Sequence, residues 1–270
     1  MPNDTYRAYG LELARWPHFK ASDWFYRYEV YGAGDKPKPM SSYVWLLQND
    51  TNTALVDCGV NPESGAARGL QLDRDIRKLL ADAGVDPAKV DHVALSHLHY
   101  DHTGNIGLFP NATFSISRAE LEFWTGPFGR QPALSAPVES REVSQVLDLA
   151  REERLVLIED ELEILPGVHT RRVGGHTPGQ TITTVDLGGS RVVLASDAVH
   201  YYEEMRLNRL YKVFTDAPAM LATYQLLREL DALPGTTVVA GHDPEVMDMF
   251  EPVSEGCVNL AAPVEGGARG

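Results

Sequence analysis

Four of the residues best suited to bind metal ions lie within one short segment. The sequence HLHYDH at residues 97–102 places two imidazoles two positions apart, followed by an adjacent carboxylate and imidazole. Residues two apart in an extended or tightly turned segment point the same way, so His97 and His99 can hold one ion while Asp101 and His102 reach a second. Imidazoles suit zinc and similar metals, and carboxylates balance charge and can bridge ions. The segment therefore predicts a site for two metal ions.

Three further candidate ligands come much later in the chain, each just after a run of apolar residues. They are His176, Asp197 and His242, in the sequences GGHTPG, ASDA and AGHD. Each lies where a sheet presents side chains at the carboxyl end of a strand. Histidines scattered at random on loops, the alternative explanation, do not account for this repeated context. We therefore expect these residues to complete the metal site.

The pattern of apolar residues predicts the elements that must position the ligands. We expect strands at 27–31, 43–48, 53–56, 90–95, 113–116, 155–158, 168–173, 181–187, 191–195 and 237–240. We expect helices at 73–83, 117–124, 139–150 and 217–233, and a loop at 126–137. Ser117 and Glu120 have the spacing of a capping box, which would begin the second of these helices. Strands and helices alternate in two roughly similar halves.

The domain organisation follows from composition. With 270 residues and 43% hydrophobic content, the chain can bury a core of ordinary size. We expect one domain at 1–254, with the aromatic stretch 1–40 packed on it as an extension. Residues 255–270, rich in Gly and Ala, are expected to be a frayed tail.

Charge and hydropathy exclude several classes of function. The net charge of −14 disfavours a nucleic-acid partner, because an acidic surface repels polyphosphate. We find no signal-peptide pattern and no uninterrupted apolar run long enough to span a membrane, so we expect a cytoplasmic protein with no membrane partner. Cys58 and Cys257 are too few for a disulfide framework and are expected to be inert thiols.

The order of motifs HLHYDH, GGHTPG, ASDA and AGHD resembles the metallo-β-lactamase superfamily over roughly residues 43–242. The resemblance implies a four-layer αββα sandwich of the α+β class. It also implies that His97, His99 and His176 hold one ion, that Asp101, His102 and His242 hold the other, and that Asp197 bridges them. The expected cofactors are two divalent ions, with Zn²⁺ as the expected metal.

The chemistry expected of such a site is hydrolysis. A metal-bound hydroxide attacks a carbonyl without a protein nucleophile, and Asp101 can orient the water. Within the superfamily the chain resembles the N-acyl homoserine lactonase branch, in its length, its complete motif and its lack of appended domains. Too few residues follow His242 for the helical domain of the glyoxalase II branch. We therefore expect a hydrolase that opens a lactone, either an N-acyl homoserine lactone or a similar cyclic ester.

One departure from that branch concerns the position three residues after Asp197. The lactonases typically carry a tyrosine there, whereas this chain has His200, followed by Tyr201 and Tyr202. An imidazole can do similar work, and a neighbouring phenol can replace it, so His200 and Tyr201 join Asp101 as candidate catalytic residues. The change also fits a different ring substrate.

Alternatives stay open at this point. One is an amidohydrolase or arylesterase acting on a cyclic amide or an aromatic ester. Another is a non-catalytic metal-binding relative, although such relatives tend to lose the carboxylates that Asp101 and Asp197 retain. Asp57, at the end of a predicted strand, is either a turn residue or a partner that orients a ligand histidine.

The expected partner is a small molecule with an apolar part. We expect the cavity walls to come from segments outside the shared core, and the aromatic residues there predict an apolar pocket. These residues are Trp24, Phe25, Trp124, Phe128 and Tyr211. The family resemblance also implies a possible homodimer.

Overall fold

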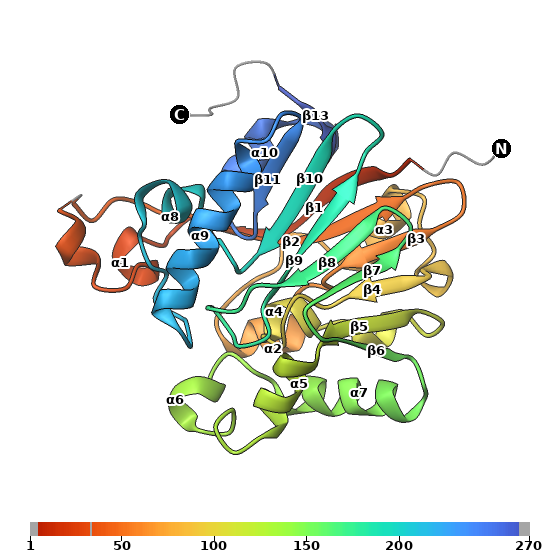
Figure 1. Cartoon of the computed structure of the whole chain (residues 1–270), viewed down its shortest axis with the longest axis horizontal. Coiled ribbons are helices and arrows are strands. Elements are labelled where there is room, and N and C mark those ends of the chain that lie inside the picture. Colours follow the sequence, from red (N-terminus) through yellow and green to blue (C-terminus); the bar gives the residue numbers. More distant parts are fainter. Residues whose placement is uncertain (1–4, 33, 265–270) are drawn as a thin grey trace.

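Two β-sheets face each other, and helices cover their outer sides (Figure 1). The structure, a computed structural model, describes residues 5–32 and 34–264. Within these residues, one sheet has the strand order β12-β13-β1-β2-β3-β4-β5-β6 and the other the order β11-β10-β9-β8-β7. The expected αββα sandwich is confirmed.

The larger sheet is mixed. Its strands β1, β2 and β3 pair antiparallel, whereas β3, β4, β5 and β6 pair in parallel. The strands are β1 (Arg7–Trp16), β2 (Met40–Gln48), β3 (Thr53–Val56), β4 (His92–Ala94), β5 (Thr113–Ser117), β6 (Leu155–Ile158), β12 (Phe250–Ser254) and β13 (Cys257–Pro263). Each parallel step needs a crossover over the outer face. The segments that hold the helices beside β4, β5 and β6 make these crossovers.

The smaller sheet presents the later candidate ligands. Its strands are β7 (Glu161–Leu165), β8 (Val168–Arg172), β9 (Thr181–Asp186), β10 (Arg191–Ser196) and β11 (Thr236–Ala240). Strands β10 and β11 pair in parallel, so their carboxyl ends lie at the same edge of the sheet. Asp197 and His242 follow those two ends and are therefore brought together.

Most helices lie on the outside of the two sheets. The α-helices of the described residues are α1 (Ala21–Trp24), α2 (Pro62–Ala67), α3 (Ile76–Asp82), α4 (Tyr100–Thr103), α5 (Arg118–Thr125), α6 (Pro132–Ser135), α7 (Ser140–Arg151), α8 (Tyr202–Leu207), α9 (Ala217–Asp231) and α10 (Glu245–Met249). Short 3-10 helices occupy Tyr28–Tyr31, Pro87–Lys89 and Ile106–Leu108. Among the described residues, no helix has the length and apolar character needed to cross a membrane.

The alternation of side chains along β2 explains the two-sided core. Trp45 and Leu47 point toward the second sheet and pack in the cluster that includes Val193. Leu46, on the other face, packs with Leu79 of α3. Successive residues of a strand face opposite sides, and both sides of this strand are covered. All of its residues but Gln48 are accordingly buried.

Three predictions about the ends of the chain are wrong. Residues 7–16 are not an extension, because β1 lies between β2 and β13 in the larger sheet. The strand predicted at 27–31 is a 3-10 helix that follows Arg27 in a left-handed conformation (φ 48°). Residues 257–263 are not a frayed tail but form β13, which pairs with β1 and β12. The rest of the predicted tail, 265–270, lies outside the described residues.

The loop predicted at 126–137 contains the short helix α6. The strands β7 and β12 and the helices α8 and α10 were not predicted. Strand β7 has the sequence ELEIL, in which glutamates interrupt the apolar pattern, and it lies at the edge of its sheet. The other predicted helices and strands lie close to their expected bounds.

Gly104 joins the HLHYDH segment to the chain that follows β3. The Gly104 amide donates to the Gly59 carbonyl at 2.8 Å, and the Cys58 amide donates to the His102 carbonyl at 2.8 Å. A Cβ at Gly104 would lie 2.1 Å from the Asn61 nitrogen, closer than real atoms approach. Only glycine fits at this contact.

We predict that Gly104→Ala lowers the free energy of unfolding by at least about 1–3 kcal/mol, because overpacking against backbone forces the two segments apart. Urea unfolding monitored by circular dichroism would measure the change. Gly107→Ala is the matched control, since its Cβ would meet only the Gln145 side chain at 4.0 Å. Equal stability of the two variants would contradict the prediction.

Candidate metal centre

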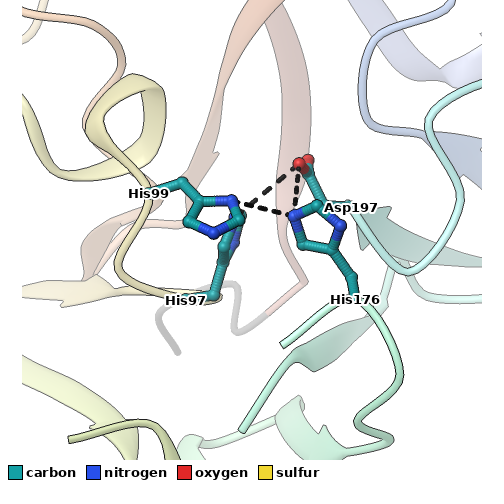
Figure 2. Close-up of side chains that lie close together, drawn as sticks. All are labelled: His97, His99, His176 and Asp197. Atoms are coloured by element: carbon teal, nitrogen blue, oxygen red, sulfur yellow. Dashed lines mark hydrogen bonds and ion pairs between the residues drawn. The ribbon is translucent and has the colours of Figure 1, made fainter. Parts of the chain in front are cut away.

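The seven predicted ligands converge at one end of the sandwich. The ligand atoms of His97, His99, His176 and Asp197 all lie within 4.8 Å of one another, and Figure 2 shows these side chains pointing toward a common centre. The ligand atoms of Asp101, His102 and His242 form a second group by the same measure. The structure thus brings together every residue that was predicted to bind metal.

Asp197 lies between the two groups. Its Oδ1 is 2.9 Å from His242 Nε2 and 3.1 Å from His102 Nε2. Its Oδ2 is 3.2 Å from His176 Nε2 and 3.6 Å from His97 Nε2. One carboxylate oxygen therefore faces each group, which is the arrangement that a bridging ligand requires.

The donor set fits two divalent ions. The Nε2 atom of His97 is buried and has no hydrogen-bond partner among the described residues. A buried polar atom without a partner is costly, and a metal ion would satisfy it. Five imidazoles and two carboxylates are also the ligand types that zinc and its neighbours prefer.

The protonation states of His97, His99 and Asp197 suit metal binding. Burial, reinforced by the neighbouring histidines, holds the pKa values of His97 and His99 well below the ordinary value. Burial alone would raise the pKa of Asp197, but the surrounding imidazoles outweigh it and hold that pKa well below its usual range. Neutral imidazoles and an ionised carboxylate are the forms that coordinate metals.

Hydrogen bonds to the surrounding chain orient three of the imidazoles. The Nδ1 atom of His102 donates to Asp57 Oδ2 at 2.8 Å. The Nδ1 atoms of His176 and His242 donate to the carbonyls of Val213 at 2.8 Å and Ser41 at 2.7 Å. Each bond leaves Nε2 directed into the centre.

Asp57 has the orienting role that the sequence left open. Besides His102, it accepts hydrogen bonds from the Ser96 amide at 2.8 Å and from the Ser196 hydroxyl at 3.1 Å. Its backbone adopts a left-handed conformation with φ 62°. Asp57 therefore connects His102 to the residues that precede His97 and Asp197.

Glu120 connects two ligand loops, and sequence reasoning missed this role. Its fully buried carboxylate accepts hydrogen bonds from the Leu98 amide at 2.9 Å and the Gly179 amide at 3.0 Å. Leu98 lies between two ligands, and Gly179 lies on the loop of His176. The indole of Trp124 donates a third bond at 2.6 Å.

The capping box predicted at Ser117 and Glu120 is wrong. Ser117 is the N-cap residue of α5, but its side chain makes no capping hydrogen bond. Glu120 turns inward because its amide acceptors lie across the site rather than on its own helix. The only signal of this role in the sequence was an acidic residue in the first turn of α5.

His200 lies beside the metal centre and contacts the carboxylate of Asp197. Its Nε2 is 3.0 Å from Asp197 Oδ2, and its Nδ1 is 3.3 Å from Glu204 Oε1. Burial lowers the pKa of His200, but the two carboxylates outweigh it and raise that pKa to about 9. The imidazole is stacked on the ring of Tyr211, with centroids 3.5 Å apart. His200 therefore contacts Asp197 and does not line the cavity described below.

The structure does not bring Tyr201 into the centre. Its ring packs against Phe25, with centroids 6.0 Å apart, and the Lys38 ammonium lies 4.6 Å from the centroid of the Tyr201 ring. Tyr202 is likewise buried, in the core between the sheets. Tyr211, expected only as part of a wall, lines the cavity at the site, as does Tyr100.

A cavity of about 170 Å³ opens onto both ligand groups. Its floor includes Asp101, His176 and Asp197, and its walls are apolar and aromatic. Trp24 and Tyr211 line it, as predicted. The other three expected wall residues do not: Phe25 and Trp124 are buried behind it, and Phe128 is 70% exposed. A larger hollow of about 610 Å³ beside α3 and α7 contains none of the ligands.

Comparison with known proteins agrees with this geometry. The model of the metallo-beta-lactamase superfamily matches residues 37–242. The chain belongs to this superfamily. All seven of the converging residues lie within the matched segment.

Several curated relatives are named N-acyl homoserine lactonases. The chain is 30% identical to N-acyl homoserine lactonase AttM of Azorhizobium caulinodans over 180 residues, which cover 62% of this chain and 64% of that protein. It is 27% identical to an N-acyl homoserine lactonase of a Bacillus species over 218 residues, 75% of this chain and 81% of that one. The match thus spans slightly less than two thirds of the AttM protein.

Solved structures share the fold over most of the chain. A quorum-quenching N-acyl homoserine lactone lactonase superimposes with a TM-score of 0.68 at 21% identity, over 91% of this chain and 95% of that one. AidC, a dizinc quorum-quenching lactonase, superimposes with a TM-score of 0.67 at 18% identity, over 90% of each chain. At these identities the likeness establishes the fold.

We predict that Glu120→Gln weakens metal binding about 10–100-fold while the protein stays folded, because the amide would point an N–H at one of the backbone donors and loosen both ligand loops. Titration of the metal-free protein with Zn²⁺ in competition with a chelator would measure the affinity. Glu122→Gln, an exposed change on the same helix, is the control and should leave the affinity unchanged. Equal affinities of the two variants would contradict this role.

Proposed function

We propose that this protein is a metal-dependent hydrolase that opens a lactone, either an N-acyl homoserine lactone or a similar cyclic ester. The observation that carries the proposal is the apolar cavity whose floor is formed by ligands of both groups. A substrate carbonyl held there lies beside both candidate metal positions. Curated relatives named as N-acyl homoserine lactonases support the same class of substrate.

The seven converging residues would hold two divalent ions, for which we propose zinc. When bound, such ions supply a nucleophile from water at neutral pH and polarise a carbonyl. His97, His99 and His176 would hold one ion, Asp101, His102 and His242 the other, and Asp197 would bridge them. The two oxygens of Asp197, each facing one group, support this assignment.

Asp101 is the proposed catalytic carboxylate. It lines the cavity and is only partly buried, and its Oδ2 lies 3.8 Å from the Nε2 atoms of both His102 and His242. A carboxylate at the boundary between ligands and cavity can orient a water molecule and accept its proton. His200, which contacts Asp197 and Glu204 but does not line the cavity, is proposed as a positioning residue.

An amidohydrolase or arylesterase would use the same groups, and the aromatic walls of the cavity also suit an aromatic ester. A panel of lactones, cyclic amides and aryl esters separates these activities. The complete ligand set beneath a cavity argues against a non-catalytic relative. The cytoplasmic location, the role in quorum quenching and the homodimer stay predictions.

We predict that purified protein contains about two metal ions per chain and hydrolyses lactones. The double variant Asp101→Asn, His102→Ala should lose the second ion. Its kcat/KM should fall by about 100-fold or more, because the nucleophile and its orientation would depend on both ions. Mass spectrometry of metals and a pH-stat assay of ring opening measure the two effects.

The matched control is His169→Ala, an exposed histidine on β8 whose Nε2 lies 3.8 Å from Glu163 Oε1. It should keep both the metal content and the activity. Two metals without lactone turnover would discard the lactonase proposal and keep the metal site. A protein that binds no metal would overturn both.

A further inference from the structure

One wall of the cavity comes from the segment between β1 and β2. Phe19 and Trp24 of this segment line the cavity together with Trp16, the last residue of β1. The Phe19 and Trp24 rings contact each other, with centroids 4.4 Å apart. This wall therefore consists of large rings that face the metal ligands across a small space.

The wall is joined to the metal centre through a series of stacked rings. Trp24 stacks on Tyr211 at a centroid distance of 5.9 Å and an interplanar angle of 16°. Tyr211 stacks in turn on His200 at 3.5 Å and 14°. His200 then contacts Asp197. The position of Trp24 is thus tied to the carboxylate between the two ligand groups.

Further contacts hold Trp24 in place. Its indole Nε1 donates to the Lys38 carbonyl at 3.1 Å, and its own carbonyl accepts from the Lys212 amide at 2.7 Å. The next residue, Phe25, forms a β-bridge with Tyr211. The Lys212 ammonium lies 5.4 Å from the centroid of the indole ring. Rotating Trp24 out of the wall would break several of these contacts together.

The space that remains is small. Pockets that hold drug-sized ligands usually measure about 300–1,000 Å³, and this cavity measures about 170 Å³. The volume beside the ligands is therefore below the range usual for such ligands, and we expect a long acyl chain to meet the aromatic wall.

The lining also limits the charge of the ligand. No lysine or arginine lines the cavity within the part of the chain that the structure describes, and the charged side chains that do are Asp101 and Asp197, both assigned to the metals. Apart from the ions, nothing there would pair with an anionic substituent. A neutral substrate is favoured.

We propose that Trp24 sets an upper limit to substrate size, so that the enzyme acts on compact neutral lactones with no acyl chain or a short one. This inference rests on the proposed lactonase function and adds a size limit to it. Truncating Trp24 removes the ring that closes the wall and leaves room for a longer chain.

The test compares kcat/KM for γ-butyrolactone, N-butanoyl homoserine lactone and N-dodecanoyl homoserine lactone. We expect the unmodified enzyme to favour the two smaller lactones over the dodecanoyl compound by about tenfold or more. Trp24→Ala should shift this ratio at least about tenfold toward the dodecanoyl compound. Because each ratio is measured on one preparation, partial unfolding of a variant cancels. Phe128→Ala, an aromatic truncation on the exposed loop, should leave the ratio unchanged.

A binding measurement separates failure of this inference from failure of the proposed function. Calorimetry with the metal-loaded protein gives the affinities of the ring-opened products N-butanoyl homoserine and N-dodecanoyl homoserine. If no lactone is hydrolysed but the short product binds better and Trp24→Ala removes the difference, the size limit stands and the lactonase proposal falls. Equal turnover or binding of short and long compounds overturns the size limit. The size limit is also overturned if Trp24→Ala gives the same ratios as Phe128→Ala. It is overturned as well if the protein hydrolyses no lactone and binds neither product.

Discussion

The structure depends on holding five imidazoles and two carboxylates together where little water reaches them. Each group loses hydration on burial, and the imidazoles repel one another whenever two of them are protonated. The Asp197 carboxylate offsets part of this cost, because it lies within 3.6 Å of four ligand imidazoles. The Nε2 atom of His97 still lacks a hydrogen-bond partner among the described residues. The remaining cost is what makes the site suited to divalent cations.

The sandwich supplies the rigidity that such a cluster needs. The ligands come from the edges of two different sheets, so their geometry depends on how the sheets pack. Two buried carboxylates connect the loops: Asp57 joins His102 to Ser96 and Ser196, and Glu120 joins Leu98 to Gly179. Neither is assigned a metal ion. Both act by fixing the backbone and the imidazoles that are.

The cavity shows how a shared metal centre is given its own selectivity. The ligand groups use the ends of the core strands, whereas Phe19 and Trp24 of the wall come from the connection between β1 and β2. Tyr211 links the two, since it stacks on both Trp24 and His200. A change in the connection would therefore alter the space for substrate while the ligands stay in place.

The sequence by itself indicated the seven candidate ligands and most core strands through local signals, and its order of motifs indicated the sandwich through the family resemblance. The uninterrupted apolar run of β2, and histidines or aspartates placed soon after apolar runs, can be recognised without knowing any contact. The tertiary structure alone decided the roles of Glu120, Asp57 and the tyrosines. Ser117 and Glu120 have the spacing of a capping box, yet Glu120 accepts from Gly179, 59 residues away. Tyr201 is next to His200 in the chain but packs elsewhere, whereas Tyr211 reaches the cavity. Strands β1 and β13, which lie near opposite ends of the chain, are likewise joined by pairing between Leu11 and Cys257. Such contacts depend on how distant segments pack, and local periodicity carries no information about that.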